Sequence, residues 1–145
     1  MKRAALLVLV VVALAYGYIG ERGLSLPGSA PSSLDTASSL QAAYRNRQSD
    51  LQVQSEGVVT RILPDDLEGS RHQKFILRMD GGQTVLVAHN IDLAPRINSL
   101  KTGDTVAFYG EYEWNDRGGV IHWTHHDPNG YHVGGWLKHE GRTYQ

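Results

Sequence analysis

Apolar and polar side chains alternate over short runs from about residue 53 to the C-terminus, and this period of two is typical of β-strands. Turn-forming residues such as Asp80-Gly81-Gly82 separate the runs. The segments with this pattern are 53–63, 74–79, 84–90, 105–114 and 120–126, and a hairpin of 136–139 and 142–144 follows. The pattern therefore predicts a mainly β fold.

The order of these segments favours one architecture. Residues 91–101 break the alternation and contain Pro95, which predicts a short helix or turn between the third and fourth strands. Five strands with such a connection are the order of a small OB-like barrel. An open β-sandwich has similar turn spacing and is the alternative fold.

The first 50 residues have a different character. Residues 4–15 form an uncharged apolar run behind Lys2 and Arg3, which indicates a signal segment within residues 1–19. Ala13-Leu14-Ala15 favours cleavage by signal peptidase, whereas apolar residues up to Ile19 favour a retained anchor, so both remain open.

Either alternative predicts an exported protein that is periplasmic or secreted, or is tethered to the inner membrane through residues 4–19. Residues 20–33 are rich in Gly, Ser and Pro and predict a flexible linker. Residues 34–50 predict a short helix, and residues 51–145 the OB-like domain with its C-terminal hairpin.

The amino-acid composition excludes several kinds of site and of ligand. The chain of 145 residues has no cysteine, which excludes disulfides, thiol nucleophiles and cysteine-ligated metals. From Glu56 onward, nine Lys and Arg stand against twelve Asp and Glu, a net charge of −3. A protein that binds nucleic-acid backbones carries a basic stripe, so we expect no generic nucleic-acid binding at neutral pH.

All seven histidines lie between His72 and His139, and the strand register places several of them. The loop 115–118 has an even number of residues, which puts the apolar sets of the fourth and fifth strands on one side. Glu111 then lies opposite His122, and Glu113 lies opposite Val120. Thr124 and His126 extend the same polar face, while His125 turns toward the core.

Two functions fit this polar face. The first is a binding domain without catalysis, whose ligand is a glycan, a peptide, a partner protein or an oligonucleotide. Its ligand-binding residues would be Tyr109, Thr124 and His126, beside Glu111 and His122.

The second function is a metal-dependent hydrolase, acting for instance on phosphodiester bonds. Zinc or a similar divalent ion would be held by His89, His122, His125 and Asp127. Glu111 and His122 would be the catalytic residues, with Glu111 as general base. The competing interpretation is that these histidines only satisfy hydrogen bonds.

Other polar and aromatic residues have simpler interpretations. Trp114, Trp123 and Trp136 are expected in the core. His139, in the final hairpin, is expected at the surface, and the pattern does not place His132.

Five sequence blocks also resemble a family of small exported bacterial proteins catalogued as a domain of unknown function. The blocks are RHQKF (71–75), AHNIDLAPR (88–96), GEYEWN (110–115), GGVIHWTHHDP (118–128) and GWLKHEGRTYQ (135–145). The resemblance covers roughly residues 55–145 and implies an envelope protein of Gram-negative bacteria. It implies no activity.

Overall fold

The structure, a computed structural model, describes residues 33–145, with side chains from residue 38 onward. The predicted signal segment and nearly all of the predicted linker lie outside the described residues. Within the described part of the chain, no helix is long and apolar enough to cross a membrane.

The described residues form one helix followed by seven strands. These are α2 (Ser33–Arg45), β1 (Leu51–Ile62), β2 (His72–Arg78), β3 (Thr84–Asn90), β4 (Thr105–Glu113), β5 (Val120–His122), β6 (Trp136–His139) and β7 (Arg142–Tyr144). Between β3 and β4 the chain makes turns and no helix.

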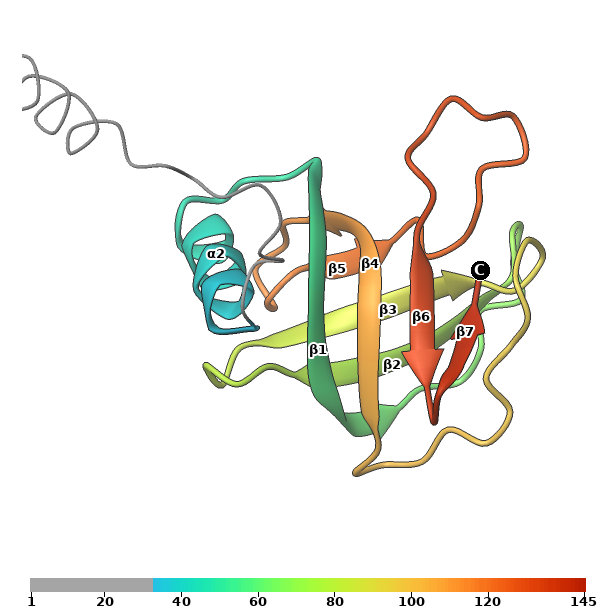
Figure 1. The fold of residues 1–145 in the computed structure, drawn as a ribbon, viewed down its shortest axis with the longest axis horizontal. Coiled ribbons are helices and arrows are strands. Elements are labelled where there is room, and N and C mark those ends of the chain that lie inside the picture. The colour runs from blue at the N-terminus through green and yellow to red at the C-terminus, as the bar shows by residue number, and fades with distance from the viewer. Residues whose placement is uncertain (1–32) are drawn as a thin grey trace, which may run out of the picture. The chain divides into compact units, whose positions relative to one another are not determined.

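The first five strands close into a barrel with the order β1-β2-β3-β5-β4, because β4 also pairs with β1 (Figure 1). The β3–β5 pair is parallel and the other pairs are antiparallel. This is the strand order of an OB-like barrel, so the predicted fold class is confirmed.

Strand β1 closes the barrel because it pairs with two partners in turn. Residues 51–58 pair with β4, and residues 58–62 pair with β2. At the change of partner lies Gly57, where an added Cβ would lie 2.9 Å from the carbonyl oxygen of Arg78. A bulge follows between Val59 and Arg61. These features give β1 the bend that a closed barrel needs.

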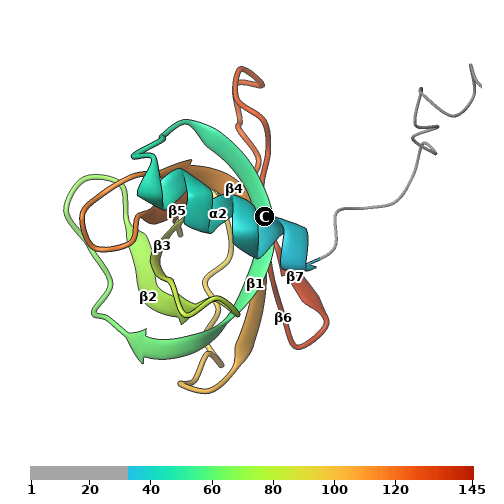
Figure 2. The same cartoon turned by 90° about the vertical axis from the view of Figure 1, so that its left-hand side faces the viewer.

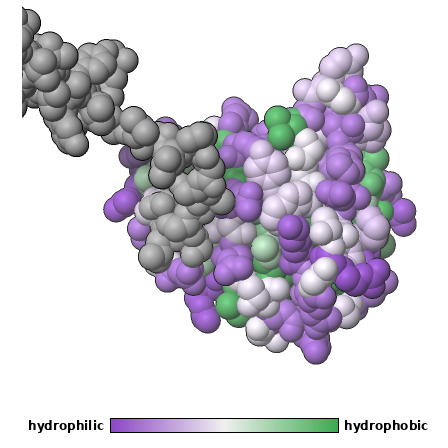
Figure 3. Space-filling view, in the orientation of Figure 1, coloured by the Kyte–Doolittle hydropathy of each residue, from purple (hydrophilic) through white to green (hydrophobic). Residues whose placement is uncertain are grey.

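The barrel interior is filled by the apolar side chains that alternate along each strand. On β4, Val106, Phe108 and Tyr112 are fully buried, and Trp114 just after the strand packs against the same core. The outer surface of β1, β4 and β6 is mostly hydrophilic or neutral, with small separate hydrophobic spots (Figure 3). One apolar face and one polar face are what the period of two requires.

Helix α2 covers one end of the barrel (Figure 2). Leu40 and Ala43, one turn apart on the helix, are completely or almost completely buried in the core. The indole Nε1 of Trp114 donates a hydrogen bond of 3.0 Å to the carbonyl oxygen of Tyr44 near the helix end. The helix is therefore an integral part of the domain.

The β6–β7 hairpin has the predicted bounds and extends the sheet beyond the barrel. On one edge, β4 pairs first with β6 and then with β5, and Gly110 lies where the partner changes. A Cβ on Gly110 would lie 2.6 Å from the carbonyl oxygen of His122. Glycine is required at this crossing because three strands meet there.

Three expectations near β5 and the hairpin are wrong. The fifth strand ends at His122 and not at residue 126, because Trp123 has a φ of 54°, which turns the chain out of the strand. Thr124 is therefore fully buried and does not extend the outer polar face. His139, expected at the surface, is 2 % exposed and is bonded through Nε2 to Asp104 Oδ2 at 2.8 Å.

Candidate functional site

The polar face of the β4–β5 pair brings two carboxylates and an imidazole together. Glu111 pairs with His122 and Glu113 pairs with Val120, as the even register predicts. Glu111 and Glu113 point to the same outer side because they are two residues apart on a strand. His122 Nε2 lies 3.4 Å from Glu111 Oε1 and 3.6 Å from Glu113 Oε1.

Glu113 lies in an environment that disfavours its charge. Burial, followed by a hydrogen bond with the nearby Asp50 carboxyl, raises the pKa of Glu113 above its usual value. With Glu111 also close, three carboxyl groups are gathered on this part of the barrel.

A second histidine, His132, contacts the other oxygen of Glu111. Its Nε2 bonds to Glu111 Oε2, and its Nδ1 donates to the carbonyl oxygen of Val133 at 2.7 Å. Burial lowers the pKa of His132, but the hydrogen bonds to Glu111 and Val133 outweigh burial and raise it overall. Because both partners are oxygen acceptors, His132 donates from Nδ1 to Val133 and from Nε2 to Glu111, and so holds the Glu111 carboxylate in place.

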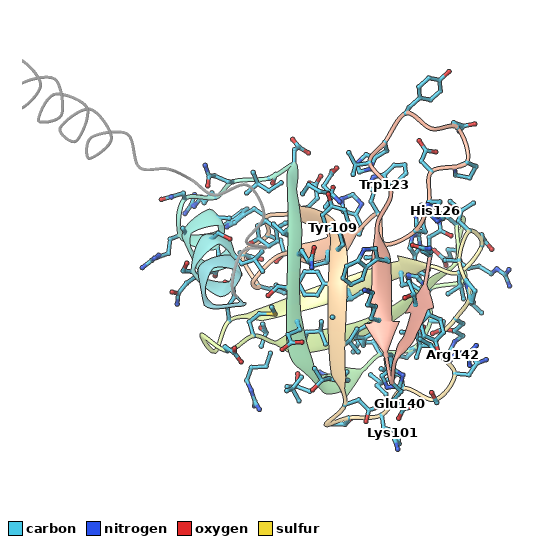
Figure 4. All side chains as sticks on the ribbon, in the orientation of Figure 1. Lys101, Tyr109, Trp123, His126, Glu140 and Arg142 are labelled. Atoms are coloured by element: carbon cyan, nitrogen blue, oxygen red, sulfur yellow. The ribbon has the colours of Figure 1, made fainter. Side chains whose placement is uncertain are left out.

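Trp123 supports His132 from the side. The two rings are stacked, with their centroids 3.9 Å apart and their planes at 7°. The ring of His125 also lies near Trp123, at 5.3 Å and tilted by 36°. In Figure 4, Trp123 lies at the opposite end of β6 from Glu140, at the base of the loop that follows β5. The indole ring was expected in the core and instead positions two imidazoles.

Asp127 organises that loop. Its carboxylate accepts backbone N–H bonds from Asn129, Tyr131 and His132 at 2.8–3.0 Å. These donors, led by Asn129, hold the pKa of Asp127 below its usual value. Asp127 thus fixes the backbone that carries His132 to Glu111.

The other residues of the predicted metal set are engaged elsewhere. His89 is fully buried, with Nε2 donating to the Pro95 carbonyl oxygen at 3.0 Å and Nδ1 bonded to Thr124 Oγ1 at 2.7 Å. Burial lowers its pKa to about 4, so the ring is neutral. His125 Nδ1 donates to the carbonyl oxygen of His126 at 2.7 Å. Among the described residues, no candidate ligand cluster contains three of His89, His122, His125 and Asp127.

Beside the Glu111–His122 pair, two adjoining hollows form a groove along the outer surface of the barrel. They have volumes of about 220 Å³ and 340 Å³, and both are lined by His72, Ala88 and His122. The smaller hollow is also lined by Ser70, Asn90, Leu93, Trp123 and His125, and the larger one by Asp66, Lys74, Glu113 and Val120.

The ligand-binding residues predicted from the sequence, Tyr109, Thr124 and His126, lie outside the groove. Tyr109 has its ring centroid 6.2 Å from that of Trp136 on β6. His126 is exposed, and Thr124 bonds to His89 inside the domain. Of the residues singled out from the sequence, the structure brings together Glu111 and His122 and places His125 near them at Trp123.

Sequence reasoning did not find His132 as a member of the site. Its partner Glu111 lies 21 residues earlier, and the loop between β5 and β6 carries no periodic pattern that predicts the contact. The available signal was Gly134-Gly135, since a Cβ on Gly135 would lie 2.1 Å from the carbonyl oxygen of Trp123. Such close backbone approach shows that the loop returns to the end of β5.

Comparison with known proteins identifies the family of this chain but assigns it no activity. Residues 24–145 match the family model described as "Protein of unknown function (DUF3465)". No curated protein matches the chain.

Proposed function

The chain belongs to the DUF3465 family, whose description assigns no function. We therefore propose a function from the geometry of the site. The chain is an exported binding domain of the cell envelope that holds an extended peptide segment of another protein in the groove beside His122. The observation that carries this proposal is the groove itself, whose lining includes the small residue Ala88 together with the imidazoles of His72 and His122.

The groove exists because β3 and β5 pair over a very short length. Only Leu86–Val120 and Val87–Ile121 are paired, and β5 ends one residue later. Strand β3 continues to Asn90, beyond the end of β5 at His122. Since Ala88 is only partly buried, its methyl group leaves room for a ligand between His72 and His122.

The lining favours a peptide over a glycan or a nucleic acid. Glycans and single-stranded nucleic acids stack on free aromatic rings, but His132 stacks on Trp123 and His125 packs near the same ring. The net charge of −3 from Glu56 onward opposes phosphate backbones. A peptide instead needs mixed donors and acceptors with apolar contacts, which Asn90, Lys74 and the 43 % exposed Leu93 offer.

Filling the groove should abolish binding. Short peptides selected from a displayed random library against the full chain are the probes. Their affinity, measured by fluorescence polarisation, should fall at least about tenfold in Ala88→Trp, because the indole occupies the space between His72 and His122.

The matched control is Ala107→Trp. Ala107 is also a half-buried alanine on the outer side of a strand, but it lies between Glu56 and Lys138, away from the groove. This variant should bind the peptides as the wild type does. Equal loss in both variants, or tighter binding of oligosaccharides or oligo-dT than of any peptide, would contradict the proposal.

Export rests on the apolar run of residues 4–15 behind Lys2 and Arg3. Fractionation of the native cells should place the chain in the periplasm, in the medium or on the inner membrane. Mass spectrometry of the native N-terminus then distinguishes a start at Tyr16, which means cleavage, from an intact Met1, which means an anchor. Recovery from the cytoplasm alone would refute export.

A further inference from the structure

Three side chains at the edge of the groove have the chemistry of a metal site that does not depend on peptide binding. Glu111, Glu113 and His122 each offer one ligand atom, and these atoms lie within 4.8 Å of one another. The set combines two carboxylate oxygens with one imidazole nitrogen, which suits a divalent transition-metal ion.

The state of His122 Nε2 is the observation that points to a ligand. This atom is inaccessible to solvent and has no hydrogen-bond partner, although two carboxylates lie beside it. Its distances to Glu111 Oε1 and Glu113 Oε1, 3.4 Å and 3.6 Å, are long for hydrogen bonds. A buried polar atom without a partner is costly, so a partner for this nitrogen is expected.

The same distances match the spacing of ligands around zinc. Zn²⁺ binds imidazole nitrogen and carboxylate oxygen at about 2.0–2.2 Å in a tetrahedral arrangement, so its ligand atoms lie about 3.4 Å apart. An ion placed among the three side chains would satisfy His122 Nε2 and neutralise the neighbouring carboxylates of Glu111 and Glu113.

The surroundings hold one of these ligands in place. Glu111 is kept in position by His132, which itself is stacked on Trp123 and bonded to Val133. Such outer partners orient the ligands in metal sites. Three protein ligands leave a fourth tetrahedral position, and Glu113 and His122 also line the larger hollow.

We propose that Glu111, Glu113 and His122 bind one divalent transition-metal ion, of which Zn²⁺ fits best, with its fourth position open to the groove. His132 is a positioning residue that orients Glu111. The ion is bound on the outer face of the barrel, and its fourth coordination position is open to a water molecule or to a polar group of a bound molecule.

The test is a zinc titration of the full chain, purified without a histidine tag and stripped with a chelator. We expect one tightly bound Zn²⁺ per chain by calorimetry and by elemental analysis after dialysis. Glu113→Gln and His122→Ala should remove this site, whereas His132→Gln should weaken it by about tenfold to a hundredfold, as loss of an outer partner does. Co²⁺ in the same site should show the intense visible absorption of four-coordinate cobalt.

Two control variants test whether zinc binds at this site and not at other candidate ligands. His126→Ala removes an exposed histidine near the same loop and should leave zinc binding unchanged. Glu140→Gln removes one member of the cluster Asp104, His139 and Glu140 at the β6–β7 turn and should also leave it unchanged. Glu113 and His122 side chains are 41 % and 32 % exposed, so their variants should fold, as circular dichroism will check. Absence of bound zinc in the wild type, or loss of zinc in Glu140→Gln but not in His122→Ala, would overturn the proposal.

Discussion

Replacing Gly119 with alanine is expected to lower the free energy of unfolding by about 4 kcal/mol, the sum of overpacking and backbone strain. A Cβ at this position would lie 2.2 Å from the ring of Tyr112, and the backbone has a φ of +98°. Tyr112 has no room to move, because it is fully buried and donates a hydrogen bond to the Gly118 carbonyl oxygen at 3.0 Å. Urea unfolding of the full chain measures the loss.

The control for this prediction is Gly130→Ala. Gly130 also has a positive φ, +69°, but a Cβ there would meet no atom within 4 Å. Only the backbone strain remains, and we expect a loss of about 1 kcal/mol. If the two variants lose similar amounts of unfolding free energy, a side chain at position 119 does not clash with Tyr112. That result would contradict the packing described for the β4–β5 connection.

Acidification is expected to destabilise the domain through His89. Its pKa is about 4 in the folded state against 6.5 for the free side chain, chiefly because of burial, with smaller contributions from His125 and His72. The unfolded state therefore binds more protons between pH 6.5 and pH 4. The stabilisation is fully present above pH 6.5 and is lost as the pH falls toward 4, by about 3 kcal/mol in total.

Urea unfolding at pH 7 and pH 5 tests this dependence. His89→Gln keeps hydrogen-bonding capacity toward Thr124 and Pro95 but cannot be protonated, so the stability difference between the two pH values should shrink by about 2 kcal/mol. His126→Gln, at an exposed position, should keep the wild-type difference. An unchanged difference in His89→Gln would mean that His89 is not the buried neutral group described.

The sequence predicts most of the fold because the strands obey simple alternation. The bounds of β3 and of the final hairpin are as predicted, and the even loop 115–118 correctly places Glu111 opposite His122. Burial decides that register, since the odd alternative would place Glu111 and Glu113 on the same side as the apolar Ile121 and Trp123.

The limits of the prediction lie where the chain leaves the strand pattern. A φ of 54° at Trp123 is a local conformation that alternation cannot anticipate, and it moves Thr124 into the interior. It also brings His89 and Thr124 together, so the predicted ligand His89 is bonded within the domain. His132 reaches Glu111 through a loop whose shape depends on Asp127, and no local pattern encodes that contact.

The most direct test of the proposed function is a map of where a selected peptide binds. Backbone amide shifts of the ¹⁵N-labelled full chain, followed by NMR during titration, supply that map. The proposal predicts that the largest changes cluster at Ala88, Asn90 and His122, around the groove beyond the β3–β5 pair. Changes concentrated on helix α2 or on the outer face of β1 and β6, with none at these residues, would contradict it.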